Sequence, residues 1–224
     1  MSIKAIGPFE PNGSSKHQRD YPQIALDAGD VRVNVPSFTR VEFSETIAMP
    51  DGKKRDRFEV LDFEHKGKKA YLSHSSAGSR LIDPPKYYGP CLVDWDKARG
   101  SVIVSIPSDS TIPKVTATAT SLPQAPDGTY KIRPRINEYK NNEHEPFVCE
   151  SYQPNDPHAC HWRALDDFWH EGYCLHRGNT SLGCISVNQV GTWESIYKIL
   201  AFCRTSDGRF SGEIRIRGHN ALTS

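Results

Sequence analysis

The stretch "LHRGNTSLGCISV", residues 175–187, holds a histidine and a cysteine on either side of a turn rich in small residues. His176 stands eight positions before Cys184. A cysteine attacks acyl groups as its thiolate, so it needs a base or a positive neighbour to lower its pKa from about 8.5. Histidine suits that role because its unperturbed pKa is about 6.5. The stretch therefore predicts a nucleophile, Cys184, beside its base, His176.

The residues around Cys184 favour the same chemistry. Ser181 and Gly183 permit a tight turn, in which the backbone N–H groups of Gly183 and Cys184 can approach a substrate carbonyl as an oxyanion hole. The apolar residues that follow predict a strand that holds the sulfur rigidly. Each residue also has an ordinary interpretation, since a buried cysteine usually packs as a small apolar side chain and a histidine near a turn usually lies at the surface.

A second motif, "APDGTYKI" at residues 125–132, precedes the first and predicts an Asp-Gly turn followed by a strand at 129–132. The two motifs together resemble the L,D-transpeptidases of the YkuD fold. That family has a His-Gly element before Ser/Thr-x-Gly-Cys-Ile, and a Pro-x-Gly-Thr-Tyr-x-Ile strand commonly comes earlier in its compact branch. The branch includes type VI secretion effectors that attack the peptidoglycan of rival bacteria.

The resemblance implies a reaction without a metal or other cofactor. His176 would take the proton of Cys184, and the thiolate would attack the bond between the L-centre of a diamino acid and the terminal D-Ala of a stem tetrapeptide. D-Ala would leave a thioacyl-enzyme, which an amine resolves by cross-linking or D-amino-acid exchange and water resolves by hydrolysis. Gly183, Ser181 and Arg177 would form the oxyanion hole or position the substrate.

Three positions depart from the family pattern. Arg177 stands where the family often has Gly or Pro, and Leu182 replaces a histidine often found before Gly183. Ser186 replaces the Arg or Asn that many classical members carry two residues after the cysteine. These departures concern the orientation of the substrate more than the identity of the nucleophile.

The resemblance also implies partners and a place of action. We expect peptidoglycan stem peptides as substrates, with a cognate immunity protein and secretion-apparatus proteins as partners. The first residues lack the apolar run of a signal peptide, and no window has the roughly 18 apolar residues of a membrane helix. We therefore expect synthesis in the cytoplasm without a signal peptide, secretion, and action in the periplasm of a target bacterium without membrane insertion. The net charge of +1 gives no reason to expect nucleic acid.

The rest of the chain predicts a mainly β fold of the sandwich or barrel type with one or two packed helices. "SVIVSIP" (101–107) predicts a strand buried on both faces, and "GEIRIRG" (212–218) predicts a strand that points Ile214 and Ile216 inward. "WRALDDFWHEGYCLH" (162–176) predicts a short helix that leads into a strand ending at His176.

A helix is expected after the cysteine. Apolar residues recur there at the spacing of one helical face and form a stripe, and Thr192 is the expected N-cap. The stripe consists of Trp193, Ile196, Tyr197 and Leu200.

Three segments are expected along the chain. Residues 1–28 predict an extended N-terminal arm, because Gly, Pro, Ser and Asn occur there without periodicity. Residues 29–85 predict a small β-rich region with short strands at "VRVNV", "RVEF", "RFEVLDF" and "KKAYLSH", which resembles bacterial SH3-like wall-binding modules. Residues 86–224 predict the L,D-transpeptidase-like catalytic domain.

Other reactive residues give competing interpretations. "PHACHW" (157–162) could bind zinc with Cys149 upstream, although His-x-Cys-His does not easily wrap one ion. A Cys149–Cys160 or Cys160–Cys174 disulfide, or a plain surface loop, is the alternative. The six cysteines are expected to be free thiols while the protein stays in the cytoplasm. His170 is the rival base.

Two other functions compete with the transpeptidase. A papain-like cysteine amidase or endopeptidase of cell-wall peptides would place its histidine after the cysteine, and His219 is the only one there. A non-catalytic wall-binding or interaction protein on the same scaffold would need none of His176, Ser181, Gly183 and Cys184.

Overall fold

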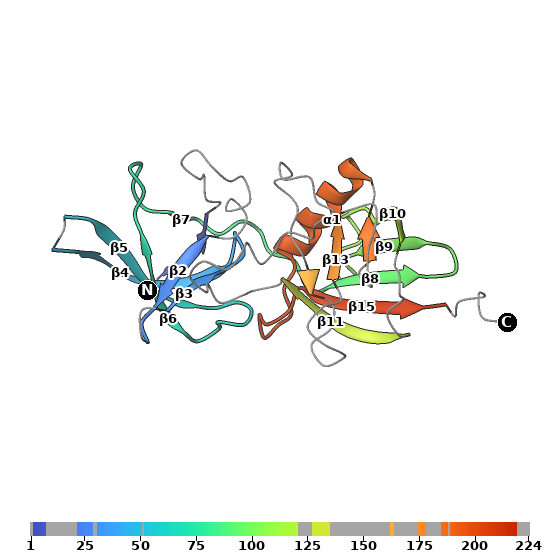
Figure 1. The fold of residues 1–224 in the computed structure, drawn as a ribbon, viewed down its shortest axis with the longest axis horizontal. Coiled ribbons are helices and arrows are strands. Elements are labelled where there is room, and N and C mark those ends of the chain that lie inside the picture. Colours follow the sequence, from blue (N-terminus) through green and yellow to red (C-terminus); the bar gives the residue numbers. More distant parts are fainter. Residues whose placement is uncertain are drawn as a thin grey trace. The chain divides into compact units, whose positions relative to one another are not determined.

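The computed structural model describes residues 2–7, 22–28, 31–50, 52–120, 127–134, 162–163, 174–177, 185–187 and 189–218. The described part is mainly β, with two curled sheets and one helix (Figure 1). It divides into two compact units, and the division falls between Lys86 and Tyr87. The sequence interpretation of a mainly β fold is confirmed.

The N-terminal unit is a seven-stranded sheet in the order β3-β2-β6-β5-β4-β1-β7. Its strands are β1 (Ser2–Ile6), β2 (Gln23–Leu26), β3 (Arg32–Asn34), β4 (Arg40–Ala48), β5 (Lys54–Val60), β6 (Lys69–Ser73) and β7 (Leu81–Ile82). Buried residues alternate with exposed or half-buried ones along β5 and β6, so that one face of the sheet closes on a core. Among the residues of that core are Ile6, Ile24, Val41, Phe58, Val60 and Leu72.

The prediction of an extended N-terminal arm over residues 1–28 is wrong for two segments, which form strands β1 and β2. β1 pairs antiparallel with β4, and its other edge pairs with β7. β2 lies between β3 and β6. Burial does not alternate along β1, where Ile3 is exposed and the successive Ala5 and Ile6 are both buried. β2 has only four residues, and its pairing with β6 joins distant parts of the chain, so the local pattern did not indicate these strands. The four strands that the sequence placed between residues 29 and 85 correspond to β3, β4, β5 and β6.

The C-terminal unit is a closed barrel in the order β10-β14-β13-β12-β11-β15-β8-β9. Its strands are β8 (Cys91–Asp96), β9 (Ser101–Ser105), β10 (Val115–Thr120), β11 (Gly128–Pro134), β12 (Trp162–Arg163), β13 (Cys174–Arg177), β14 (Ile185–Val187) and β15 (Gly212–Arg217). Two neighbouring pairs are parallel, β13 with β14 and β15 with β8, and the other pairs are antiparallel.

The barrel strands alternate as half-buried strands do. Ile214 and Ile216 face inward as predicted, and Arg215 and Arg217 face outward. β9 is not buried on both faces as the sequence predicted: Val102 and Val104 are buried, while Ile103 between them is only half-buried. Both neighbours of β9 are antiparallel, and such sheets commonly leave one face partly open to water.

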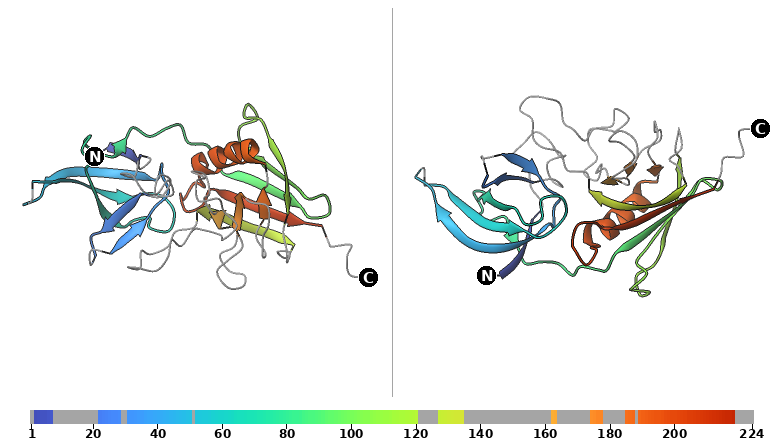
Figure 2. Two further views of the ribbon diagram at one scale, coloured as in Figure 1. Left: turned by 45° about the horizontal axis from the view of Figure 1, so that its top comes forward. Right: turned by 90° about the horizontal axis from the view of Figure 1, so that it is seen from below.

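One helix, α1 (Val190–Phe202), packs against β9 and β10 of the barrel (Figure 2). Its predicted stripe is confirmed, because Trp193, Ile196 and Leu200 are fully buried and Tyr197 is nearly so. The helix begins earlier than predicted. Gln189 is the N-cap, in extended backbone, and its carbonyl accepts the first helical hydrogen bond from the N–H of Trp193.

The end of α1 is fixed by a buried cation. The Arg204 guanidinium donates to the carbonyl oxygens of Ala201 and Cys203 at 2.9 and 2.7 Å. These carbonyls lack helical partners, and the helix dipole favours positive charge at this end. The described helix lacks the length and apolar character needed to cross a membrane.

The prediction of a short helix within residues 162–176 is wrong at its first residues, because Trp162 and Arg163 form strand β12. The strand predicted to end at His176 is β13, which ends one residue later. The residues between β12 and β13 lie outside the described part.

Candidate functional site: paired strands at the ends of the Cys184 motif

The two ends of the motif at residues 175–187 form neighbouring parallel strands of the barrel. Leu175 is in register with Ile185, His176 with Ser186 and Arg177 with Val187. Leu175 directly precedes His176, and Ile185 directly follows Cys184. The backbone therefore brings together the residues that flank the predicted base and the predicted nucleophile.

The described side chains of this strand pair are buried. Leu175, Ile185 and Val187 are at most 2% exposed, and the polar Ser186 between the last two is fully buried. In the backbone register of the two strands, His176 lies opposite Ser186. Ser186 is one of the three positions that depart from the pattern of the family that the motifs resemble, and it is in register with the predicted base.

Cys184, Gly183 and Ser181 lie outside the described residues, so the predicted nucleophile and oxyanion hole stay predictions. His176 and Arg177 are described as backbone positions of β13. His170, Cys149 and the "PHACHW" segment up to His161 also lie outside. Among the described residues, no three His, Cys, Asp or Glu side chains gather as a metal would require.

The second motif supplies strand β11 of the same barrel. β11 pairs with β12, and β12 pairs with β13, so "GTYKI" stands two strands away from His176. Gly128 in this motif makes room for its neighbour Tyr130: a Cβ atom at Gly128 would lie 2.8 Å from the Tyr130 Oη. The contact with Tyr130 thus gives a local packing reason for a glycine at position 128, in addition to its place in the motif.

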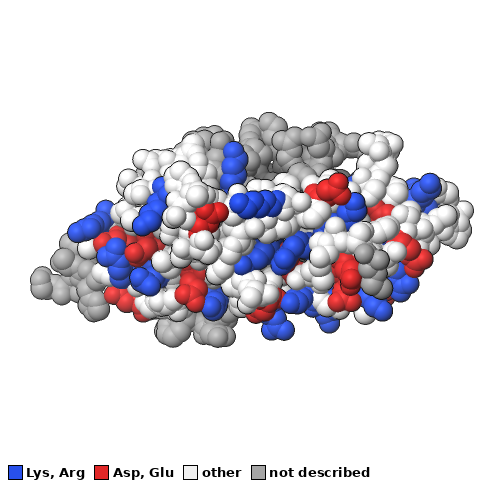
Figure 3. Space-filling model, turned by 180° about the vertical axis from the view of Figure 1, so that it is seen from behind, with Lys and Arg blue, Asp and Glu red and all other residues white. Residues whose placement is uncertain are grey.

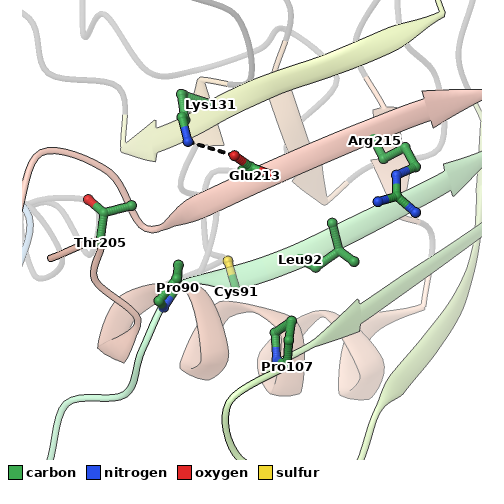
Figure 4. A pocket seen from close by; sticks show the side chains of 8 residues that line it. All are labelled: Pro90, Cys91, Leu92, Pro107, Lys131, Thr205, Glu213 and Arg215. Carbon is green, nitrogen blue, oxygen red and sulfur yellow. Dashed lines mark hydrogen bonds and ion pairs between the residues drawn. The ribbon is translucent and has the colours of Figure 1, made fainter.

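A shallow hollow lies elsewhere on the barrel, at the ends of β8, β11 and β15 (Figure 4). Lys131 and Glu213, which are in register on β11 and β15, form an ion pair of 2.6 Å at one side of it (Figure 4). It is lined by Pro90, Cys91, Leu92, Pro107, Lys131, Thr205, Glu213 and Arg215. None of these residues belongs to the predicted site.

On the face drawn in Figure 3, charges of both signs are interspersed among the described residues. On the barrel, Arg217 pairs with Asp94 at 2.9 Å and with Asp96 at 2.8 Å. These contacts neutralise charge locally and leave a mixed rather than a single-sign surface there.

Sequence reasoning missed a polar cluster in the N-terminal unit. The buried Asp56 carboxylate accepts from Thr46 at 2.7 Å and from Ser79 at 2.5 Å, and the His74 Nε2 lies 2.9 Å from it. In a catalytic triad the histidine stands between serine and carboxylate. Here both bind the same carboxylate, so the cluster is a structural network rather than a triad.

The network sets the charge state of Asp56. Burial raises the pKa of its carboxyl, but the hydrogen bonds to His74, Ser79 and Thr46 together outweigh burial and hold the pKa below its usual value. Asp56 lies on β5, His74 follows β6, and Ser79 precedes β7. Strand pairing brings these three residues together, and no local sequence motif indicates the cluster.

Sequence reasoning also missed a pair of thiols in the barrel unit. Cys91 begins β8 and Cys203 follows α1, and their side chains are in hydrogen-bond contact. Both are buried and free. The chain positions are far apart, so no spacing in the sequence indicated the pair.

Comparison with protein-family models, with curated proteins and with solved structures gives no match for this chain.

Proposed function

We propose that this chain is a cysteine-dependent L,D-transpeptidase or L,D-carboxypeptidase that acts on peptidoglycan tetrapeptide stems. One observation carries the proposal: Leu175 and Ile185, which flank the predicted base and nucleophile, are in register on adjacent parallel strands. The motif resemblance supplies the chemistry, and the second motif lies on a strand of the same barrel.

In the proposed reaction, His176 accepts the proton of Cys184. The thiolate then attacks the carbonyl carbon of the bond before the terminal D-Ala, and the backbone N–H groups of Gly183 and Cys184 stabilise the oxyanion. His176 returns the proton to the leaving D-Ala amine. An amine or water then attacks the thioester and restores the free thiol. Ser181 and Arg177 are proposed to position the stem peptide.

The proposed biological role is that of an antibacterial type VI secretion effector, active in the periplasm of a target bacterium. A cognate immunity protein would protect the producing cells. We expect it to insert a group between His176 and Cys184 and so to occlude the proposed site. A complex that leaves Cys184 open to alkylation would count against this occlusion.

Turnover of defined stem peptides tests the activity. Tetrapeptide stems ending in D-Ala are incubated with the protein, and D-Ala release and product masses are measured. We expect His176→Ala and Cys184→Ala each to lose roughly a thousandfold or more in rate, because base and nucleophile act as a unit. Cys184→Ser should also be very slow, since a serine hydroxyl is far less acidic than a thiol.

His170→Ala is the matched control and should retain most of the activity. Circular dichroism checks that each variant is folded. Near-normal turnover by His176→Ala, together with loss in His170→Ala, would contradict the assignment of the base. Activity that depends on His219 would favour the papain-like amidase, and stem-peptide binding without any turnover would favour the wall-binding protein.

Alkylation of the unmodified chain gives a second, independent readout. An activated thiolate at Cys184 should react with iodoacetamide faster than the other five cysteines. Cys91 and Cys203 serve as internal references, because both are buried. Equal labelling of Cys184 and these two thiols would mean that His176 does not activate it.

A further inference from the structure

Two cysteines from opposite ends of the barrel unit's sequence meet in its interior. Cys91 is 2% exposed and Cys203 is fully buried, and their side chains are in hydrogen-bond contact. Cys91 is the first residue of β8, next to Pro90 (Figure 4). The two side chains are thus partners in space without being neighbours in sequence.

The backbone of each cysteine is held by its own strand-type hydrogen bonds. Cys203 forms a parallel bridge with Tyr88, in which the Tyr88 N–H donates to the Phe202 carbonyl and the Tyr88 carbonyl accepts from the Arg204 N–H. The Cys91 N–H donates to the Ser211 carbonyl at 3.0 Å. Both cysteines thus lie in hydrogen-bonded backbone of the barrel unit.

Both cysteines of the pair are buried, although Cys91 also lines the hollow described above, and a cation lies near the pair. Hydrogen bonding to Cys203 and burial raise the pKa of the Cys91 thiol well above its ordinary value, and the nearby Arg204 guanidinium opposes this only in part. The folded barrel therefore keeps the Cys91 thiol protonated and poorly reactive.

We propose that Cys91 and Cys203 are a disulfide-forming pair whose state is set by the compartment in which the chain folds. Folding in a reducing compartment leaves two buried thiols. Folding in an oxidising compartment joins them and ties the start of β8 to the end of α1. This inference concerns the barrel scaffold and holds whether or not Cys184 is catalytic.

The oxidation is a thiol–disulfide exchange with a small-molecule or protein disulfide as oxidant. One cysteine loses its proton to solvent and attacks a sulfur of oxidised glutathione, which releases one glutathione thiolate and leaves a mixed disulfide. The second cysteine thiolate attacks the mixed disulfide and releases the other glutathione. The protein loses two electrons and two protons, and one oxidised glutathione becomes two reduced ones.

Because both sulfurs are buried, we expect the disulfide to form at a different rate during folding than in the folded protein. An oxidant cannot reach sulfurs that are at most 2% exposed, so exchange needs the unfolded chain or an opening of the barrel. We expect the disulfide to form during oxidative refolding at least roughly a hundredfold faster than when oxidised glutathione is added to folded, reduced protein.

Peptide mapping of the full chain tests the pairing. The protein is unfolded with reductant and then refolded in either a glutathione redox buffer or dithiothreitol. Free thiols are alkylated and the chain is cut with trypsin, which places Cys91 in residues 87–97 and Cys203 in residues 199–204, each as the only cysteine of its peptide. We expect these two peptides linked after oxidative refolding and separately alkylated after refolding in dithiothreitol.

Thermal unfolding of the two preparations gives a second readout. Closing a loop of roughly 110 residues constrains the unfolded chain, so the oxidised form should have a Tm higher by roughly 5–15 °C. Cys203→Ala should abolish the linked peptide and the Tm difference between the two refolding conditions. Cys149→Ala and Cys184→Ala are the matched controls and should keep both.

Peptides 87–97 and 199–204 that stay separately alkylated after oxidative refolding of the wild-type chain would overturn the pairing. So would a link from Cys91 to any of the other four cysteines. A disulfide that forms as fast in the folded protein as during refolding would overturn the dependence on the folding compartment.

Discussion

At the scale of single residues, Gly212 at the start of β15 is the described glycine that lies closest to the backbone of another strand. Gly212 is in register with Cys91 on the parallel strand β8. A Cβ atom there would lie 2.0 Å from the Cys91 carbonyl oxygen and 2.6 Å from its nitrogen. These are backbone atoms of a neighbouring strand, so they cannot move aside as the tip of a side chain could.

We predict that Gly212→Ala destabilises the barrel unit by at least about 2 kcal/mol, because β8 and β15 must separate to admit the methyl group. Chemical denaturation measures the change. Gly191→Ala in the exposed first turn of α1 is the control, since nothing lies within 4 Å of the added atom. It should leave stability unchanged or raise it by up to about 1 kcal/mol. Equal effects of the two variants would contradict the prediction.

Asp56 makes the N-terminal unit sensitive to acid. Its folded pKa lies below the unfolded value of about 3.8, so its stabilising contribution is complete above that value and disappears as the pH falls through the folded pKa. We predict that Asp56→Asn lowers the free energy of unfolding of this unit by about 2–3 kcal/mol at pH 7 and by clearly less at pH 3. Hydrogen exchange of β4, β5 and β6 at the two pH values measures the difference.

Asp83→Asn is the control for Asp56→Asn. The Asp83 carboxyl is exposed, and its hydrogen bond to Lys4 lowers its pKa as well. An exposed pair in water contributes little to stability, so this variant should behave as the wild type at both pH values. If Asp56→Asn shows the same loss at pH 3 as at pH 7, ionisation of Asp56 is not the source of its contribution.

At the scale of elements, α1 is held by its buried face. Ile196 is fully buried in the middle of that face, and Ser195 next to it in sequence is exposed. We predict that Ile196→Asp prevents the barrel unit from folding, because it buries a charge without a partner and removes an apolar side chain. Ser195→Asp places the same charge in water and should change stability by less than about 0.5 kcal/mol. A folded and soluble Ile196→Asp protein would refute the placement of the helix face.

At the scale of the whole molecule, the chain carries two separate sheets, each with buried residues of its own. Compact units of this kind generally fold around their own cores. We predict that Ile196→Asp removes hydrogen-exchange protection from β8, β9, β10 and β15 while β4, β5 and β6 of the N-terminal unit stay protected. Mass spectrometry of peptides from each unit measures this. Loss of protection in both units would show that they unfold together.

Local patterns in the sequence were enough for several elements. The stripe from Trp193 to Leu200 predicts α1, and Ile214 and Ile216 predict the inward face of β15, because helices and strands impose periods of 3.6 and 2 on apolar residues. The motif at residues 175–187 predicts a strand at each end, and both ends are strands. The period fails for two strands. In β1, Ile3 is exposed and the successive Ala5 and Ile6 are both buried, and β2 has three apolar residues in a row.

By itself, the sequence determined that the chain is mainly β, where most strands and the helix lie, and which histidine and cysteine to propose as a reactive pair. Only the tertiary structure decided which strands are neighbours. It set β13 parallel to β14, placed β1 within the sheet of the N-terminal unit, and brought Cys91 to Cys203. The physical reason is range: side-chain periodicity acts between residues a few positions apart, whereas strand pairing joins backbone groups from distant parts of the chain and leaves little trace in any local window.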